Sequence, residues 1–216
     1  MHERPQGELF HALRRLGYRI DSENDNLPAV FHGTGPNEAA CTVSLNKSSQ
    51  FASALLLSAE AGKWIVDFAG ARLDEAPYVQ MTCELIKAFP NGGGEFAVEP
   101  DASSGSYFWG VNCIHEGVEV ANWPLTGWQV DAQFPRFLSQ PREVSRQTDL
   151  GDSIMTAIVL APLADRPTSF TDLGHLRVQE CERVQSLRTE LEKCGAKIIE
   201  EGDTLHIETS PDLHGA

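Results

Sequence analysis

One spacing of apolar residues and glycines occurs twice along the chain. It is shared by two sets of residues, Leu9, Leu13, Gly17 and Ile20 near the start and Leu187, Leu191, Gly195 and Ile198 near the end. Apolar positions four residues apart predict a helix, the glycine suits its C-terminal end, and a strand is expected to follow. After the second set, alternation at 197–200 and 204–208 around a Glu-Gly-Asp turn predicts a β-hairpin.

A weaker third copy of this pattern lies in the middle of the chain. Met81, Leu85 and Phe89 are again four apart, and they precede a glycine-rich turn at 91–94 and a candidate strand at 95–98. Repeated helix–strand–strand modules favour an α/β protein built from duplicated units. Chance is the alternative explanation, because helices with this kind of ending are common.

Further elements are predicted by local start signals and by short apolar runs. Helices are expected at 50–61, at 78–89, from Asp101 to about His115, and at 153–163, where Asp152 resembles a helix cap. Strands are expected at 43–45, 64–68 and 118–121. The segment 139–150 is polar and without periodicity, so it is interpreted as a loop. A domain boundary is expected near Pro100.

The charge and cysteine content narrow the classes of protein. The 216 residues include 17 basic and 31 acidic side chains, a formal net charge of −14. This balance argues against a nucleic-acid partner, which needs clustered Lys and Arg. No apolar run is long enough for a membrane span, and the polar first residues do not resemble a signal peptide. The five cysteines are irregularly spaced, which favours free thiols in the cytoplasm.

The sequence contains no common cofactor-binding or metal-binding motif. Cys113 and His115 are the closest pair of metal-ligand type, and no second pair stands at ligand spacing. The residues Gly33-Thr34-Gly35 predict a turn, because a lone Gly-x-Gly is weak evidence for a dinucleotide loop. We therefore expect neither a metal nor an organic cofactor.

Two segments place chemically useful side chains at predicted helix starts. Ser48, Ser49 and Gln50 offer hydroxyls and an amide beside a helix N-terminus, which suits a phosphate, although a simple serine cap is the alternative. Glu180 and Arg183 are three residues apart, a spacing that is also typical of a surface ion pair.

Five motifs occur together in one order, at 48–56, 77–82, 101–108, 152–156 and 177–183. They read Ser-Ser-Gln-Phe-x-x-Ala-Leu-Leu, Pro-Tyr-Val-x-Met-Thr, Asp-Ala-Ser-Ser-x-Ser-Tyr-Phe, Asp-x-x-Met-Thr and Arg-Val-x-Glu-x-x-Arg. In this combination the chain resembles the 3-phosphoshikimate 1-carboxyvinyltransferase (EPSP synthase) family.

The resemblance implies a fold and a reaction. The fold is α/β, with repeated βαβαββ units of the enolpyruvyl transferase type (an inside-out α/β barrel), here an incomplete set. Residues 1–99 would form the second half of one domain, and residues 100–216 about two units of the other. The reaction transfers the enolpyruvyl group of phosphoenolpyruvate to the 5-hydroxyl of shikimate 3-phosphate, without a cofactor.

The resemblance also assigns roles to residues that match the family motifs. Phosphoenolpyruvate would be bound by Arg4, Gln50 and Arg183, and shikimate 3-phosphate by Ser48, Ser49 and Tyr78. Asp152 would accept the proton of the reacting hydroxyl, and Glu180 would lie near the methylene carbon of phosphoenolpyruvate. Two carboxylates among arginines can be tuned to different proton roles.

Several features depart from the family pattern. Gln179 replaces a usual Lys, Glu75 a usual Ser and His175 a usual Asn, and the first two make the shikimate-phosphate side more negative. The chain also corresponds to only about half of a family member. It could therefore be a non-catalytic anion-binding remnant, a fragment, or a protein completed by self-association or by a complementary chain. A sister enolpyruvyl transferase acting on a UDP-sugar is a further alternative.

Overall fold

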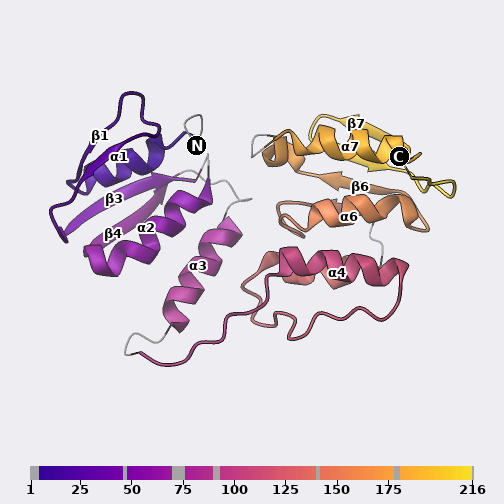
Figure 1. The fold of residues 1–216 in the computed structure, drawn as a ribbon, viewed down its shortest axis with the longest axis horizontal. Helices are drawn as coiled ribbons and strands as arrows, with labels where there is room; N and C mark the ends of the chain where they lie inside the picture. Colours follow the sequence, from indigo (N-terminus) through magenta and orange to yellow (C-terminus); the bar gives the residue numbers. More distant parts are fainter. Residues whose placement is uncertain are drawn as a thin grey trace. The chain divides into compact units, whose positions relative to one another are not determined.

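The computed structural model describes residues 5–45, 48–69, 76–89, 93–139, 142–177 and 181–215. The chain divides into two compact units, Met1–Phe96 and Ala97–Ala216, here called unit 1 and unit 2 (Figure 1). Both units combine helices with β-strands, so the α/β class expected from the sequence is confirmed.

Unit 1 contains two small sheets and three helices. Its elements are α1 (Gly7–Arg15), β1 (Arg19–Asp21), β2 (Val30–His32), β3 (Ala39–Ser44), α2 (Ser49–Gly62), β4 (Trp64–Ala69) and α3 (Ala76–Ala88). Strands β1 and β2 pair antiparallel, and β3 and β4 pair parallel with Ala39 opposite Trp64. The order β3–α2–β4–α3 is thus a β-α-β-α module.

Unit 2 contains a four-stranded sheet in the order β5-β6-β8-β7. Its elements are α4 (Ala102–Ile114), η1 (Val130–Gln133), α5 (Phe134–Phe137), β5 (Glu143–Ser145), α6 (Ile154–Leu160), η2 (Ala161–Leu163), β6 (Thr168–Thr171), η3 (Leu173–Arg177), α7 (Arg183–Lys193), β7 (Ile198–Glu201) and β8 (Thr204–Ile207), where η marks 3-10 helices. Strands β5 and β6 are parallel, and β8 is antiparallel to both β6 and β7. The order β5–α6–β6–α7 repeats the module of unit 1.

The repeated helix–glycine–strand pattern is confirmed in both units. Gly17 follows α1 with φ +91°, and Gly195 follows α7 with φ +89°, a backbone region that residues with a Cβ rarely adopt. Strand β1 begins soon after the first glycine and β7 soon after the second. The predicted hairpin is also present, as β7 and β8.

The predicted helices and two further predicted strands are confirmed, and two of the predicted start signals act as caps. The Ser48 hydroxyl accepts a hydrogen bond from the backbone N–H of Gln50 at 3.1 Å and so caps α2. Asp101 caps α4 by accepting from the N–H of Ser103 at 2.9 Å. The strands expected at 43–45 and 64–68 are parts of β3 and β4.

Two predicted strands are wrong. Residues 95–98 form no strand, because the chain there leads into Glu99, whose carboxylate accepts from the N–H groups of Leu125 and Thr126. Residues 118–121 also form no strand. The backbone N–H of Val118 donates to the Asn112 side chain, so it is not available for a hydrogen bond to a neighbouring strand. In both segments apolar and polar residues alternate, but no strand among the described residues pairs with them.

The segment predicted as a loop at 139–150 contains a strand, β5. It is a three-residue edge strand in which Val144 alone is buried, at 2% exposure, between polar neighbours. One apolar residue gives no readable alternation, which explains why the sequence pattern missed it.

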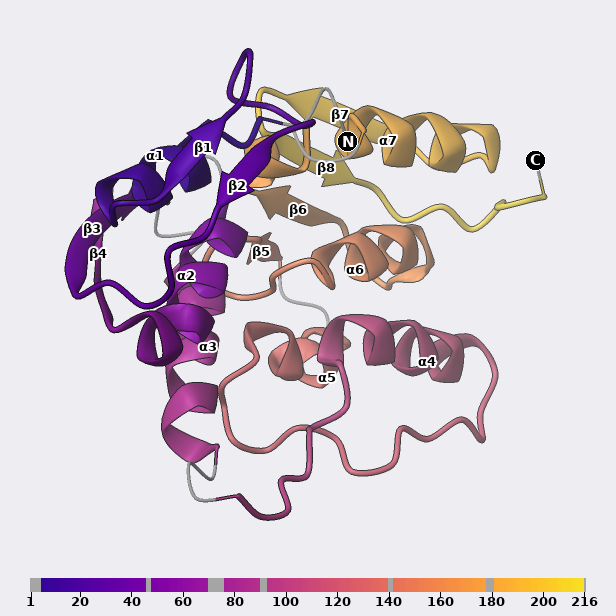
Figure 2. The same ribbon diagram turned by 60° about the vertical axis from the view of Figure 1, so that its left-hand side comes forward.

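Each unit has its own hydrophobic core. In unit 1 it joins α1, β3, α2 and α3 through Ala12, Leu16, Cys41, Val43, Leu45, Ala52, Leu55 and Val79. In unit 2 it packs α6 and α7 on one face of the sheet through Phe134, Val144, Leu150, Ile154, Ile158, Ala161, Phe170, Leu173, Leu176, Val184, Leu205 and Ile207. Helix α4 lies next to α6 (Figure 2), where the hydroxyls of Ser106 and Thr156 are 2.7 Å apart.

Candidate functional site

The start of α2 carries three of the predicted site residues. Ser48 is half-buried and its hydroxyl caps the helix, so the serine-cap interpretation is confirmed for this residue. Ser49 is 6% exposed, whereas Gln50 is exposed to solvent. The helix start therefore presents the Gln50 amide outward, next to a positive helix-dipole end.

Tyr78, in the first turn of α3, lies at the same end of unit 1 as the start of α2. The helices are joined by the hydroxyls of Ser53 and Thr82, which are 2.8 Å apart. Ser49 lies one helical turn before Ser53 in α2, and Tyr78 lies one helical turn before Thr82 in α3. Because β3 and β4 are parallel, α2 and α3 both begin where these strands end at their carboxyl termini. Ligands in α/β folds commonly bind at that edge.

A polar groove runs along this edge, and the sequence analysis did not predict it. It is lined by α1 residues Glu8, His11, Arg14 and Arg15 and by Thr42, Ser44 and Ala69 of the strands. The Arg14 guanidinium donates to Asp25 at 2.7 Å, while the Arg15 side chain is exposed. One sequence feature could have indicated Arg14 and Arg15, because both lie on the polar face of the first predicted helix.

In unit 2, Asp152 lies in the turn between β5 and α6. Its Oδ1 accepts a hydrogen bond from Arg146 Nη2 at 3.0 Å. The Arg146 side chain is 1% exposed and that of Asp152 is 34% exposed. A buried guanidinium without a counter-charge is costly, so Arg146 fixes the carboxylate and leaves its other side toward solvent.

The prediction that Asp152 caps the next helix is wrong. Ser153 is the N-cap residue of α6, and among the described residues no side chain caps this helix. The backbone N–H of Ser153 donates to Asp131 Oδ1 in η1 at 2.7 Å. Burial raises the pKa of Asp131, and the charge of Asp152 adds to this, while the Ser153 hydrogen bonds and Arg146 oppose it. Neither Arg146 nor Asp131 belongs to a motif, so no sequence pattern pointed to this cluster.

Arg183 is the first residue of α7, and an ion-pair network centred on Arg177 includes its neighbour Glu182. The Glu182 carboxylate caps α7 by accepting from the N–H of Gln185 and also pairs with Arg177. Arg177 further donates to Glu200 at 2.7 Å and to Asp203 at 3.0 Å. Burial alone would lower the pKa of Arg177, but its hydrogen bonds to these carboxylates raise it.

The described site residues fall into two equivalent positions. Ser48, Ser49, Gln50 and Tyr78 stand at the helix starts of the unit 1 module, and Asp152 and Arg183 stand at those of the unit 2 module. Arg4 and Glu180 lie outside the described residues, as do Glu75 and Gln179. His175, the third departure from the family pattern, is buried at 8% exposure.

The described part of the chain offers anion-binding and proton-accepting groups. It contains no group of three His, Cys, Asp or Glu side chains placed to hold a metal ion. All five cysteines are free thiols. None of the helices in the described ranges combines the length and the apolar character that crossing a membrane requires.

Known proteins similar to this chain were found by sequence and by structure. The family model described as EPSP synthase (3-phosphoshikimate 1-carboxyvinyltransferase) matches residues 1–93 and 140–216. The 3-phosphoshikimate 1-carboxyvinyltransferase of Rhizobium etli is 31% identical over 244 residues, covering 100% of this chain and 57% of that protein. The enzyme of that name from Pseudomonas savastanoi pv. phaseolicola gives the same identity and coverage.

A solved structure, the EPSP synthase of Acinetobacter baumannii, shares the fold. It superposes with a TM-score of 0.67 at 21% sequence identity, over 100% of this chain and 61% of that one. This supports the incomplete set of enolpyruvyl-transferase units expected from the sequence, since the chain spans little more than half of the curated relatives that it matches. Because the family model covers most of its residues, the chain belongs to the EPSP synthase family.

Proposed function

We propose that this chain takes part in the transfer of the enolpyruvyl group of phosphoenolpyruvate to the 5-hydroxyl of shikimate 3-phosphate. The observation that carries the proposal is Asp152, a partly exposed carboxylate fixed by the buried Arg146 beside the start of α6. A carboxylate in such a setting can accept a proton in a reaction, and its family position is that of the residue beside the reacting hydroxyl.

Substrate binding is assigned to the helix starts. Ser48, Ser49 and Tyr78 hold shikimate 3-phosphate, because hydroxyls and backbone N–H groups at a helix N-terminus suit a phosphate. Phosphoenolpyruvate is held by the other three substrate-binding residues, Gln50, Arg183 and Arg4. Guanidinium groups bind phosphate and carboxylate in a bidentate manner, and the amide of Gln50 is exposed for a further hydrogen bond.

The chemical steps follow from these positions. Asp152 takes the proton of the 5-hydroxyl of shikimate 3-phosphate while the hydroxyl oxygen bonds to the central carbon of phosphoenolpyruvate. Glu180 gives a proton to the methylene carbon. The Glu180 carboxylate then takes a proton back from the new methyl group as the carbon–oxygen bond to phosphate breaks, which restores the double bond. The departing phosphate takes the proton held by Asp152. The residues invoked supply acid, base and anion binding, so the proposal uses no cofactor.

Further polypeptide completes the site in this proposal. Residues 1–99 and 100–216 each form part of one of two domains, and the rest is supplied by self-association or by a complementary chain. The basis is the 57% coverage of the curated relatives. We place the protein in the cytoplasm, where the five free thiols would stay reduced.

The test is release of phosphate from phosphoenolpyruvate plus shikimate 3-phosphate. The chain would be assayed alone and mixed with a second chain that carries the segments present in its longer relatives. We expect turnover that falls by about 10²–10⁴ in Asp152→Asn and is unchanged in Glu190→Gln, a matched carboxylate-to-amide change at an exposed residue. The proposal is contradicted if phosphate is released neither by the chain alone nor by the mixture of the two chains. Saturable phosphoenolpyruvate binding without turnover would favour the non-catalytic alternative.

A further inference from the structure

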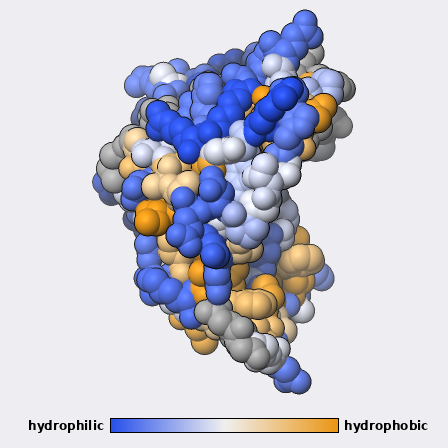
Figure 3. Space-filling view, turned by 90° about the vertical axis from the view of Figure 1, so that its left-hand side faces the viewer, coloured by the Kyte–Doolittle hydropathy of each residue, from blue (hydrophilic) through white to orange (hydrophobic). Residues whose placement is uncertain are grey.

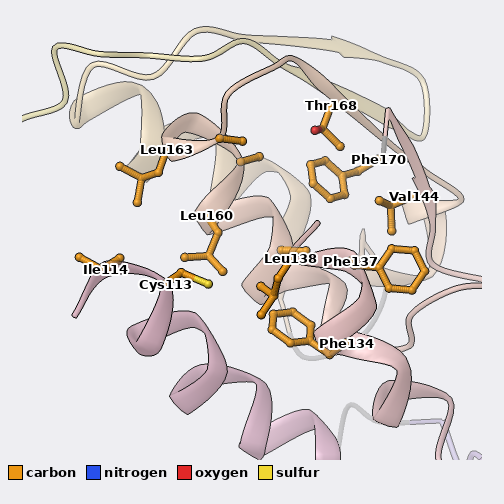
Figure 4. Close-up of a pocket in the computed structure, with 13 residues that line it drawn as sticks. Cys113, Ile114, Phe134, Phe137, Leu138, Val144, Leu160, Leu163, Thr168 and Phe170 are labelled. Carbon is orange, nitrogen blue, oxygen red and sulfur yellow. The ribbon is translucent and has the colours of Figure 1, made fainter. Parts of the chain in front are cut away.

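Unit 2 contains an apolar cavity of about 160 Å³ that the proposed transferase site does not use. Figure 4 shows the side chains around it. Its inner wall is formed by Phe134, Val144 and Phe170, each no more than 2% exposed. Its outer rim includes Ile114 and Leu163, which are 68% and 53% exposed. The cavity therefore has a buried end and an apolar opening.

The lining of the cavity is uncharged. Among the described residues that line it, two carry polar side chains, the Thr168 hydroxyl and the Cys113 thiol, and the others are aliphatic or aromatic. Burial raises the pKa of the Cys113 thiol, which keeps it neutral. A cavity of about 150 Å³ lined by Leu, Ile and Phe stays dry and binds benzene. This cavity is similar in volume and in its aliphatic and aromatic side chains, and it differs in being open to solvent at one end.

The rings around the cavity favour an aromatic guest. Phe134, Phe137 and Phe170 all line it, and aromatic pairs gain from edge-to-face contacts beyond the burial of their area. No carboxylate or guanidinium lines the wall, so an ionised group of a ligand would have to stay at the rim.

Five of the described residues that line the cavity come from the part of the chain that the family model does not match. Cys113, Ile114, Phe134, Phe137 and Leu138 lie between residues 94 and 139. The opposite wall comes from β5, α6, η2 and β6, inside the matched residues. The cavity thus combines residues inside the family match with residues outside it.

We propose that this cavity binds a neutral, single-ring aromatic molecule or the aromatic ring of a larger one. The ring is held between the buried phenylalanines, and any polar substituent points to the opening beside Cys113. This proposal does not depend on the transferase activity.

The direct test is titration of the full chain with toluene, followed by NMR of its methyl groups. We expect saturable shifts at Val144 and Leu160, which line the cavity. In Ala157→Leu the added carbons fill the cavity, and toluene affinity should fall about tenfold or more. Ala54→Leu, at an exposed position of α2, is the matched control and should bind as the unmodified chain does. No saturable shift, or equal affinity in Ala157→Leu, overturns the proposal.

A second readout needs no variant. Cys113 and Cys181 are both exposed thiols, and Cys113 lines the cavity whereas Cys181 lies outside it. Toluene should slow alkylation of Cys113 by N-ethylmaleimide and leave the rate at Cys181 unchanged, as measured by peptide mass spectrometry. Equal alkylation of Cys113 with and without toluene would also count against the site.

Discussion

The β-α-β-α modules of the two units share one order of elements and differ in the charge at their helix starts. In unit 1 the first turns of α2 and α3 present Ser48, Ser49, Gln50 and Tyr78, which are all uncharged. In unit 2 the corresponding positions present Asp152 and Arg183, with the buried Arg146 behind the former. In the proposed function, one scaffold would therefore support two kinds of chemistry, hydrogen bonding to an anion in one copy and proton transfer beside a cation in the other.

The modules also differ in how their sheets are completed. In unit 2 the hairpin after α7 places β8 against β6, whereas in the described part of unit 1 strand β4 pairs with β3 alone. Unit 1 accordingly leaves Leu57, Ile65 and Phe68 exposed at 60%, 67% and 42%, and hydrophobic side chains are visible among hydrophilic ones in Figure 3. The hairpin adds Leu205 and Ile207 to the core of unit 2.

The largest effect that would sharpen this comparison is expected for Asp152→Ala. The variant leaves the Arg146 guanidinium buried without its paired carboxylate, so the free energy of unfolding should fall by about 3 kcal/mol. Urea denaturation would measure it. The double variant with Arg146→Met removes the stranded charge and should recover most of the loss. A single variant as stable as the unmodified chain would show that the pair does not matter.

A smaller effect is expected for Arg177→Gln, which breaks the network before α7. The hydrogen bonds to Glu182, Glu200 and Asp203 are lost and three carboxylates are left near one another, which should cost about 2 kcal/mol. Unlike a change at the neutral helix starts of unit 1, this loss should shrink as salt is added, because salt screens the remaining repulsion. A loss independent of salt would contradict an electrostatic origin.

Ser48→Ala should lower the free energy of unfolding by about 1 kcal/mol, since it removes the cap of α2 and strands no charge. Ser58→Ala, at an exposed position inside the same helix, is the control and should change it by less than about 0.5 kcal/mol. Equal effects at the two serines would argue that the cap contributes nothing.

The smallest effects concern pH, where one carboxyl from each unit should respond in opposite directions. Hydrogen bonds from Arg19 and His32 lower the pKa of Asp21 in unit 1 to about 2. The stabilisation from Asp21 is therefore present above its unfolded pKa, near 3.8, and is lost as the pH falls toward 2. Asp131 in unit 2 has a raised pKa, so its contribution is present below 3.8 and is lost as the pH rises through the folded value.

Carbon NMR titration of the side-chain carboxyls would check this pair. The midpoint of Asp21 should lie near 2 and that of Asp131 above 3.8. Midpoints in the reverse order would contradict the account of the two environments.

The sequence predicted the parts of the fold that depend on local pattern. The spacing of Leu9, Leu13 and Gly17 predicted a helix and its end, because both follow from neighbouring residues. Strand pairing is not local, so the alternation at 118–121 misled, and the short strand around Val144 was missed. A strand exists only where a partner lies beside it.

For the candidate site, the motifs located the helix starts but not the residues behind them. Ser48 and Asp152 were both predicted as caps, and the structure supports only the first. The backbone N–H of Ser153, at the start of α6, donates to Asp131, 22 residues away, and no spacing rule reaches that far. Arg146 was missed for the same reason, since its partner is defined by the turn after β5.

The central claim is that the helix starts of both modules bind the substrates, and one measurement tests it most directly. Amide NMR spectra of the full chain would be recorded during titration with phosphoenolpyruvate in the presence of shikimate 3-phosphate. The account predicts saturable shifts at residues 48–50 and at both Asp152 and Arg183, with no shift at Glu190, an exposed residue of α7. Shifts confined to one module, or none at saturating substrate, would contradict it.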